Sequence, residues 1–534
     1  MKNEKQYISD IIGKRGITKK HLFNDGYYSI IAGGVGTGKS TFTCKGLAKI
    51  LNCKSSEILL IAPLVAIEQQ LIAKGNAEKQ DLTQAFFKVD NVPVCTYAAL
   101  MNKIKAKTLS PQIKYFVFDE AHQLITSESY AKYGAFFLKW LDDNGIQALF
   151  LTATPMALLT YEHGKKPFKE VLGVKSNVKV DKIIFTTEKD LLTHVKYFAR
   201  NKMFIAVQTV VEAQKLEKQL NDCMPGSAKA IFSKTHDKAT DEMRTVADKI
   251  IKTEQFPEGV QFVIVNGAYT EGMEIQTKCE SALVKLPSVT AIVQAVGRLR
   301  KGVDDVVVVL SKDQFYAQTK RSFDEFNKFL IEYRKADELL KRELLLGMYS
   351  IQKEHFGHEF VNIHSMNGYV PDYQINMPLY HSFEINLYDA KRLYCENDEI
   401  SNDQFEQLEA IFKPYFPNSK FVRLTQEGMT SKEDDYDNDM RAFLSDLNNE
   451  RVYTEQNKNG ITVDQVCRKV MQLRKEYNIF SKRPVQCTRS LNNAIDKYGY
   501  KMGKRSSQRI KDVFGRATGE KVTFYLMERT QKQS

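Results

Sequence analysis

Short apolar segments alternate with longer helical stretches between about residues 27 and 310, and this alternation restricts the fold of the 534-residue chain more than any other feature. The segments are almost continuously apolar, as strands of a parallel sheet are when helices cover both of its faces. The predicted strands are 28–32, 58–62, 92–96, 115–118, 148–151, 204–207, 262–265 and 306–310. We therefore expect an α/β fold with two tandem, doubly wound domains.

The segment after the first predicted strand carries the pattern of a phosphate-binding loop. Residues 33–41 read Gly-Gly-Val-Gly-Thr-Gly-Lys-Ser-Thr, which fits G-x-x-x-x-G-K-[ST]. In such a loop, backbone N–H groups and the N-terminus of the next helix face the phosphates. We expect Lys39 to reach the β- and γ-phosphates of ATP and Ser40 to ligate Mg²⁺. The other predicted nucleotide-binding residues of the loop are Gly33, Gly36, Gly38 and Thr41.

An acidic pair follows the fourth predicted strand, where residues 119–122 read Asp-Glu-Ala-His. The carboxyl ends of parallel strands line the crevice in which α/β proteins bind ligands. We therefore predict that Asp119 holds Mg²⁺ and that Glu120 activates the attacking water. An isolated Asp-Glu pair would more often cap a helix, but the phosphate-binding loop earlier in the chain favours catalysis.

Together these motifs resemble those of superfamily 2 helicases of the DEAH-box type. Residues 152–155, Thr-Ala-Thr-Pro, follow the next strand and resemble motif III of that family. The resemblance implies two RecA-like domains with ATP between them. It also implies that His122, Thr152 and Thr154 couple the ATP state to the grip on nucleic acid.

Three further segments extend the resemblance. Residues 61–69 resemble motif Ia, residues 96–100 resemble motif Ib, and residues 204–209 resemble motif IV. In the family, motifs Ia and Ib contact the sugar–phosphate backbone of nucleic acid. The resemblance therefore implies that Pro63 and Thr96 are nucleic-acid contacts.

The second predicted domain carries the remaining motifs. Residues 271–275, Glu-Gly-Met-Glu-Ile, resemble motif V and assign Gly272 to the nucleotide site. Residues 294–301, Gln-Ala-Val-Gly-Arg-Leu-Arg-Lys, resemble motif VI, although Lys301 stands where the second arginine is expected and Arg300 comes one position early. Either residue could complete the site, and arginine suits phosphate oxygens better because its donors form a rigid fork. The catalytic residues implied by this match are Gln294, Arg298 and Arg300.

Charge is unevenly distributed along the chain. The net charge is +12, and residues 451–534 hold 19 Lys and Arg against 7 Asp and Glu, so the first 450 residues balance. This bias indicates a polyanion-binding module. A capping box of Thr462 and Gln465 opens one amphipathic helix, a second is predicted at 484–498, and a strand is predicted at 521–526. The pattern resembles a winged helix, with predicted nucleic-acid contacts at Arg489, Lys497, Lys504 and Arg505.

The chain is expected to contain five regions. They are an N-terminal extension (1–26), a first RecA-like domain (27–175), a second RecA-like domain (176–312), a helical and mixed accessory region (313–450) and a basic winged-helix-like domain (451–534). We predict the linker between the RecA-like domains near 160–185, a stretch that contains Gly164, Pro167 and Gly173. The acidic residues 433–439 are interpreted as a solvated linker or as a shield for the basic end.

Composition limits the other possibilities. No apolar run reaches the roughly 18 to 20 residues of a membrane span, and eight cysteines without a Cys-x-x-Cys pair favour a reducing, cytoplasmic environment. The histidines at 355, 358 and 364 form a weak candidate metal site. Pro371-Asp372 with Asp389-Ala-Lys391 loosely fits a nuclease pattern.

The combined prediction is a helicase or translocase that uses ATP and Mg²⁺ and acts on nucleic acid. We expect DNA rather than RNA as the substrate, in replication, recombination or repair. A motor of this kind with a basic C-terminal domain resembles virus- and phage-encoded replication helicases, including the herpesvirus origin-binding type. The alternatives are an RNA helicase, a duplex-DNA translocase subunit of a restriction or defence complex, and a motor fused to a nuclease.

Overall fold

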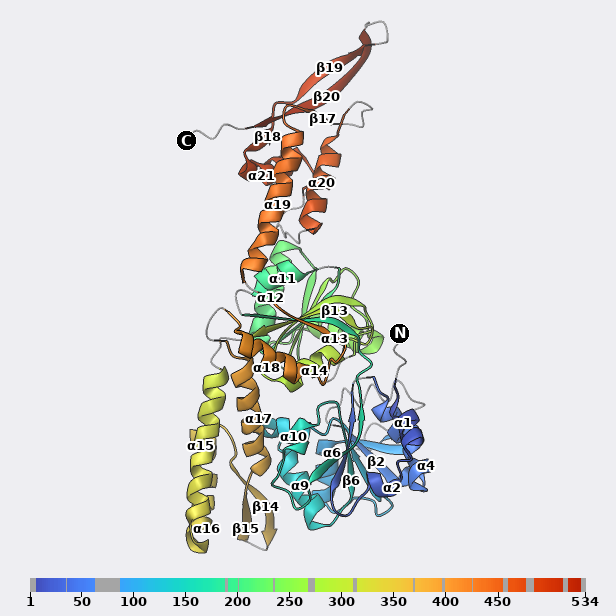
Figure 1. The fold of residues 1–534 in the computed structure, drawn as a ribbon, viewed down its shortest axis with the longest axis vertical. Helices are drawn as coiled ribbons and strands as arrows, with labels where there is room; N and C mark the ends of the chain where they lie inside the picture. Colours follow the sequence, from blue (N-terminus) through green and yellow to red (C-terminus); the bar gives the residue numbers. More distant parts are fainter. Residues whose placement is uncertain are drawn as a thin grey trace.

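The computed structural model describes residues 6–34, 36–62, 87–187, 191–199, 201–233, 236–267, 274–310, 315–367, 370–395, 399–424, 426–454, 460–476, 485–511 and 517–529. The molecule is elongated (Figure 1). Two α/β domains are stacked along its long axis, helices α15 to α17 lie beside the first domain, and a C-terminal module lies beyond the second. Within the described part of the chain, no helix is long and apolar enough to cross a membrane.

The first α/β domain is built on a sheet with the strand order β3-β4-β2-β5-β6-β1-β7. All neighbouring strands are parallel except the β3–β4 hairpin. The strands are β1 (Tyr28–Gly33), β2 (Ile58–Ala62), β3 (Phe87–Val89), β4 (Val92–Thr96), β5 (Tyr115–Phe118), β6 (Ala148–Thr152) and β7 (Phe168–Val174). This order brings the carboxyl ends of β1, β5 and β6 side by side, because the three strands are adjacent and parallel.

Helices cover both faces of this sheet, and the apolar side chains of its strands divide between two cores. The helices are α1 (Ile8–Arg15), α2 (Lys19–Leu22), α3 (Lys39–Thr41), α4 (Leu47–Leu51), α6 (Tyr97–Lys105), α7 (Gln123–Thr126), α8 (Glu128–Ala131), α9 (Tyr133–Asp143) and α10 (Met156–Leu159). A wide π-turn at Phe42–Gly46 joins α3 to α4.

The second α/β domain has a sheet with the order β10-β11-β9-β12-β13-β8-β16, and every pair in it is parallel. The strands are β8 (Val180–Thr187), β9 (Met203–Val207), β10 (Ala228–Ile231), β11 (Phe262–Asn266), β12 (Cys279–Lys285), β13 (Val303–Leu310) and β16 (Lys420–Arg423). Its helices are α11 (Leu191–Phe198), α12 (Val210–Cys223), α13 (Asp241–Thr253) and α14 (Val289–Gly297). The predicted doubly wound tandem domains are therefore confirmed, as are all eight predicted strands.

Only residues 175–179, between β7 and β8, join the two sheets, so the interpretation of residues 160–185 as a linker is wrong for the rest of that stretch. Strand β7 pairs with β1. It lies at the edge of its sheet, so several of its side chains are exposed and it lacks the continuous apolar character of a central strand.

The region after β13 is helical at first, as expected for the helical and mixed accessory region (313–450). It comprises α15 (Phe315–Lys335), α16 (Glu338–His355), the antiparallel hairpin of β14 (Val361–Asn367) and β15 (Val370–Ile375), α17 (Met377–Leu393) and α18 (Asn402–Phe412). Helix α17 contacts α7, α8, α9 and α10 of the first domain. The chain then returns to the second domain, where α18 packs on the core and β16 pairs with β8.

The C-terminal module begins with helix α19 (Gln426–Asp446), which contains the acidic residues 433–439. These residues are therefore part of a helix that packs in the module's core, and the interpretation of this stretch as a solvated linker is wrong. Tyr436, Met440 and Leu444 of α19 are buried in one core with side chains of the remaining elements. Those elements are β17 (Arg451–Tyr453), α20 (Val463–Glu476), α21 (Thr488–Ile495), β18 (Tyr500–Met502), β19 (Ser506–Lys511) and β20 (Ala517–Arg529).

The local predictions for this module are largely confirmed. Gln465 Oε1 accepts from the Thr462 backbone N–H at 2.8 Å, and the Gln465 N–H donates to Thr462 Oγ1 at 3.2 Å, which is the predicted capping box. Two helices and an antiparallel hairpin of β19 and β20 follow. The Asn492 side chain is partly buried and accepts from the Met502 N–H at 2.7 Å, which joins α21 to β18.

Candidate functional site

The loop after β1 curls back on itself around the side chain of Lys39. Gly36 and Gly38 have φ values of 75° and 81°, in the left-handed region that glycine adopts without a Cβ clash. Lys39, the first residue of α3, donates from Nζ to the Gly33 carbonyl at 2.9 Å. The loop therefore has the backbone shape of a phosphate cradle at a helix N-terminus.

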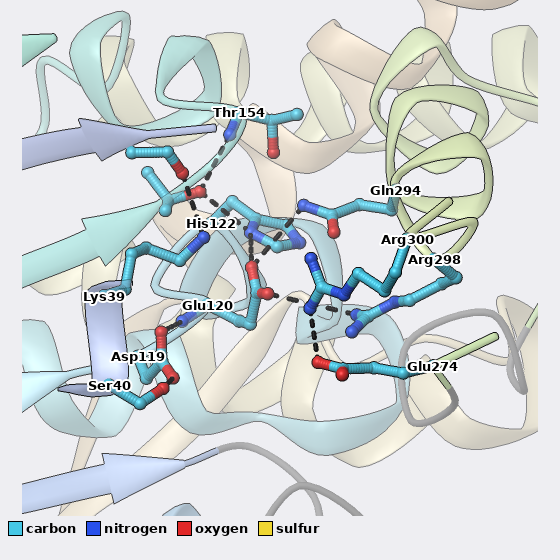
Figure 2. Close-up of polar contacts among 12 residues, drawn as sticks. Lys39, Ser40, Asp119, Glu120, His122, Thr154, Glu274, Gln294, Arg298 and Arg300 are labelled. Carbon is cyan, nitrogen blue, oxygen red and sulfur yellow. Dashed lines mark hydrogen bonds and ion pairs between the residues drawn. The ribbon is translucent and has the colours of Figure 1, made fainter. Parts of the chain in front are cut away.

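The acidic pair lies at the end of β5, next to this loop (Figure 2). Asp119 and Glu120 are 4% and 8% exposed, so the structure holds two carboxylates almost out of solvent. Ser40 Oγ lies 3.4 Å from Asp119 Oδ2. Glu120 has a φ of 46°, a backbone conformation that is rare for a residue with a side chain and is found at functional sites.

The two carboxylates differ in their pKa values. Burial, together with the neighbouring charge of Glu120, raises the pKa of Asp119 to about 6. Burial acts on Glu120 in the same direction, but the positive charges of Lys39, Arg298 and Arg300 outweigh it and lower the pKa of Glu120. Glu120 is thus the carboxylate that stays ionised.

The opposite wall of the site comes from the second domain. Helix α14 brings the Gln294 amide to 3.5 Å from Glu120 Oε2, and Arg298, at the end of the same helix, lies 3.9 Å from Glu120 Oε1 (Figure 2). All three side chains are buried. Glu120 therefore faces a cleft between the two domains, and residues from both domains line a cavity of about 390 Å³.

Arg300, and not Lys301, lines this cleft. One guanidinium nitrogen of Arg300 pairs with Glu274. Its other nitrogen, Nη1, is buried without a hydrogen-bond partner among the described residues and lies 3.7 Å from where a Cβ on Gly36 would be. Lys301 is exposed. The free donor of Arg300 therefore points at the phosphate-binding loop.

A buried hydrogen-bonded chain leads from the acidic pair to the end of β6. His122 Nδ1 lies 3.0 Å from Thr152 Oγ1, and that oxygen accepts from the Thr154 backbone N–H at 3.1 Å. Burial lowers the pKa of His122 to about 4, so its ring is neutral at pH 7. The three residues predicted to couple ATP state to nucleic acid are therefore brought into contact.

Two residues at the loop were missed in the sequence. The Asn177 side chain donates to the Gly36 carbonyl at 3.0 Å and also bonds both backbone polar groups of Gln6. Tyr7 is 43% exposed and lines the same cleft. Both lie in loops far along the chain from the nucleotide motif, and no short-range pattern marks them.

The remaining predicted residues lie elsewhere. The Thr96 hydroxyl accepts from the Ala99 N–H at 3.2 Å and caps helix α6. Pro63 and Gly272 fall outside the described residues. The predicted contacts of the C-terminal module, Arg489, Lys497, Lys504 and Arg505, are exposed. Lys497 is also paired with Asp437 of α19 at 2.9 Å.

The metal and nuclease patterns gain no support from the geometry. Asp389 is buried and accepts from the Val289 N–H at 2.9 Å, while Asp372 accepts from Gln374 at 3.0 Å. Across the described ranges, no group of three or more His, Cys, Asp or Glu side chains could hold a metal ion. The His364 side chain is outside the described part.

The residues present fit a nucleotide bound with Mg²⁺. The Ser40 hydroxyl and the Asp119 carboxylate are hard oxygen ligands on adjacent sides of the cleft. Asp119 is a buried carboxylate whose ionised form a divalent cation would stabilise. Lys39, Arg298 and Arg300 would meet phosphate charge.

Residues 17–160 match the family model for DEAD/DEAH box helicases. A search of curated protein sequences finds no match. Among solved structures, Saccharomyces cerevisiae Dbp5 bound to RNA and ADP–BeF3 is 14% identical with a TM-score of 0.41, over 80% of this chain and 96% of that one.

Two longer proteins are also similar. The Escherichia coli DEAH/RHA helicase HrpB is 12% identical with a TM-score of 0.38, over 59% of this chain and 46% of its own. The DUF1998 helicase MrfA bound to DNA is 14% identical with a TM-score of 0.35, over 57% of this chain and 46% of its own. This chain therefore spans less than half the length of either.

The site and the family match point to the same class of protein. Residues 17–160 match the model of DEAD/DEAH box helicases, and they lie in the first of the two tandem RecA-like domains. A domain of that class implies ATP hydrolysis coupled to remodelling of nucleic acid. The family model covers only the first domain, and the match does not specify the kind of nucleic acid.

Proposed function

We propose that this protein is an ATP-driven DNA helicase that hydrolyses ATP in the cleft between its two RecA-like domains. The observation that carries the proposal is the position of Glu120. It is buried at the end of a first-domain strand and meets Gln294 and Arg298 from the second domain. A site that needs both domains ties hydrolysis to their relative position.

Each residue of the cleft has a chemical part in this proposal. Lys39 and Arg298 neutralise phosphate charge in the transition state, and Arg300 adds a donor beside the phosphate-binding loop. Glu120, with its lowered pKa, accepts the proton of the water that attacks the γ-phosphate. Ser40 and Asp119 would hold Mg²⁺, which supplies positive charge to the phosphates when bound.

The preference for DNA rests on the C-terminal module. Helices α20 and α21 and the β19–β20 hairpin follow one another in the order of a winged helix. Lys504 and Arg505 are exposed between β18 and β19. Arg489 is exposed in the first turn of α21. Such donors suit phosphates and base edges of a duplex. We propose that this module holds DNA while the motor moves, in replication, recombination or repair.

An ATPase assay with single-stranded DNA, duplex DNA and RNA in parallel tests this function. We expect DNA to stimulate hydrolysis, and the Glu120→Gln variant to lose roughly 10²- to 10⁴-fold in kcat because the general base is gone. Stimulation by RNA alone would make the protein an RNA helicase. Full activity of Glu120→Gln would exclude the proposed site.

Strand displacement on a forked DNA substrate separates unwinding from translocation. A helicase releases the displaced strand in proportion to ATP consumed. A duplex translocase of a restriction or defence complex would hydrolyse ATP on DNA and release no strand, so that result would replace the helicase proposal.

A further inference from the structure

Helix α17 is anchored on the first RecA-like domain along its N-terminal half. It contacts α7, α8, α9 and α10 there, and Met377 and Ile385 pack on the first-domain core. A polar contact reinforces this packing, because His381 Nε2 lies 3.1 Å from the hydroxyl oxygen of Thr160. Thr160 directly follows α10, the short helix that begins after the Thr152–Thr154 segment.

The C-terminal end of α17 reaches the second domain (Figure 1). Asp389 accepts from the backbone N–H of Val289, the first residue of α14, at 2.9 Å. Ser288 accepts from the Ala291 N–H at 3.2 Å at the same helix end. The buried N-terminus of α14 therefore receives one acceptor from its own cap and a second, negatively charged one from α17.

Helix α14 is the element that carries the second-domain side of the ATP site. Gln294 lies within it and Arg298 follows its last residue, and both side chains approach Glu120. Because α17 is fixed on the first domain, its hydrogen bond to α14 links the two walls of the cleft by a path that does not pass through nucleotide.

We propose that Asp389 is a positioning residue for ATP hydrolysis, which holds α14 so that Arg298 and Gln294 meet the first-domain site. The proposal rests on the proposed ATPase function. In this proposal α17 acts as a brace that fixes α14 of the second domain relative to the first domain. Asp389 thereby gains a role other than the weak nuclease pattern in which it stands in the sequence.

Steady-state ATPase kinetics of the full chain with saturating DNA test this role. We expect Asp389→Ala to lower kcat about tenfold and to change the KM for ATP by less than about twofold, because a lost cap displaces α14 without removing a nucleotide contact. The Asp389→Asn variant keeps an acceptor of the same shape and should retain more activity than Asp389→Ala. Asp403→Ala is the matched control, since Asp403 lies exposed in the first turn of α18.

A double-mutant cycle separates positioning from general damage. If Asp389 acts through α14, the Asp389→Ala change should have little further effect in an Arg298→Ala background. Equal fold-losses in both backgrounds would overturn the proposal, as would a wild-type kcat in Asp389→Ala. If Asp389→Ala fails to fold, the same cycle is run with Asp389→Leu, which removes the acceptor and keeps a branched side chain, and the same two results decide.

Hydrogen exchange gives a readout that needs no turnover. Amides of residues 289–297 should exchange faster in Asp389→Ala than in the wild type and remain unchanged in Asp403→Ala. Unchanged exchange in Asp389→Ala would contradict the proposed brace. A wild-type protein without ATPase activity would instead disprove the function, and the exchange result would still stand on its own.

Discussion

Asp119 and Glu120 are neighbours in sequence, yet the site shifts their pKa values in opposite directions. Glu120 faces the cationic groups of the cleft, which keep it ionised. Asp119 is buried beside Ser40, and its pKa is raised to about 6, so it binds a proton at a higher pH than an exposed aspartate does. Environments that separate two adjacent carboxylates in this way divide a metal-binding role from a proton-accepting one.

This difference predicts competition between protons and Mg²⁺ at Asp119. Below a pH of about 6 the carboxyl is protonated in the free protein, so the affinity for Mg²⁺ should fall about tenfold per pH unit there. Raising Mg²⁺ should therefore move the acid limb of the pH–rate profile to lower pH. An acid limb at the same pH in low and high Mg²⁺ would contradict this assignment.

Arg300 and Lys301 offer a direct comparison of neighbouring cations. Arg300→Ala should lower kcat by roughly 10²- to 10³-fold, because it removes a donor aimed at the phosphate-binding loop. Arg300→Lys should restore little of this loss, since lysine lacks the fork that can pair with Glu274 and phosphate together. Lys301→Ala, at an exposed position, should stay within about twofold of wild type.

Helix α19 shows how one element can serve two purposes. One side of it fills the core of the C-terminal module through Tyr436, Met440 and Leu444. Asp437 accepts from Lys497 Nζ at 2.9 Å and from the Tyr498 hydroxyl at 2.7 Å. The acidic helix therefore engages a residue that we predict to contact nucleic acid.

Loss of the contact between Asp437 and Lys497 should strengthen DNA binding. Asp437→Asn weakens the pairing of Lys497, so DNA affinity should rise about two- to fivefold. The slope of log affinity against log salt concentration should become steeper by up to about one released counterion. Asp446→Asn makes the same charge change at the exposed end of α19 and is the control. Equal gains from both variants would show that net charge acts, and not the contact with Lys497.

Strands that are continuously apolar could be predicted from the sequence, and the strands β7 and β16 at the sheet edges could not. Strand β2 matches its predicted range, because central strands are buried on both faces. Strands β7 and β16 are half exposed at the edges of their sheets, and neither was predicted as a strand. The nucleotide residues were found because they follow strands in fixed patterns. Asn177 and Asp389 act through contacts far apart in sequence, which no local pattern records.

At the scale of the whole molecule, the structure changes how the basic charge divides between the C-terminal module and the rest of the chain. The C-terminal module starts at α19, and residues 426–534 hold 21 Lys and Arg against 15 Asp and Glu, a net charge of +6. Residues 1–425 hold 56 against 50, which leaves the same net charge. The excess is thus shared between motor and module, and within the module 7 of the 15 acidic residues lie on α19.

This boundary predicts where the chain can be shortened. A protein of residues 1–424 should keep basal ATPase activity and lose DNA affinity and salt sensitivity, because the module has a core of its own. A protein of residues 1–450 should be less stable, since α19 would expose its apolar side. Thermal unfolding and salt-titrated binding of both check this, and equal stability of the two would contradict it.

The pairing of β16 with β8 makes the accessory helices an insertion within the second sheet. Ser419 Oγ donates to the Val180 carbonyl at 2.7 Å, across 239 positions of the chain. During synthesis on the ribosome, the open edge of β8 must wait until residue 423 has emerged, long after the rest of the sheet is complete. Until then that edge has unpaired backbone groups, which are a template for wrong pairing. Completion of the second sheet therefore depends on a strand that is made some 240 residues after the first strand of that sheet.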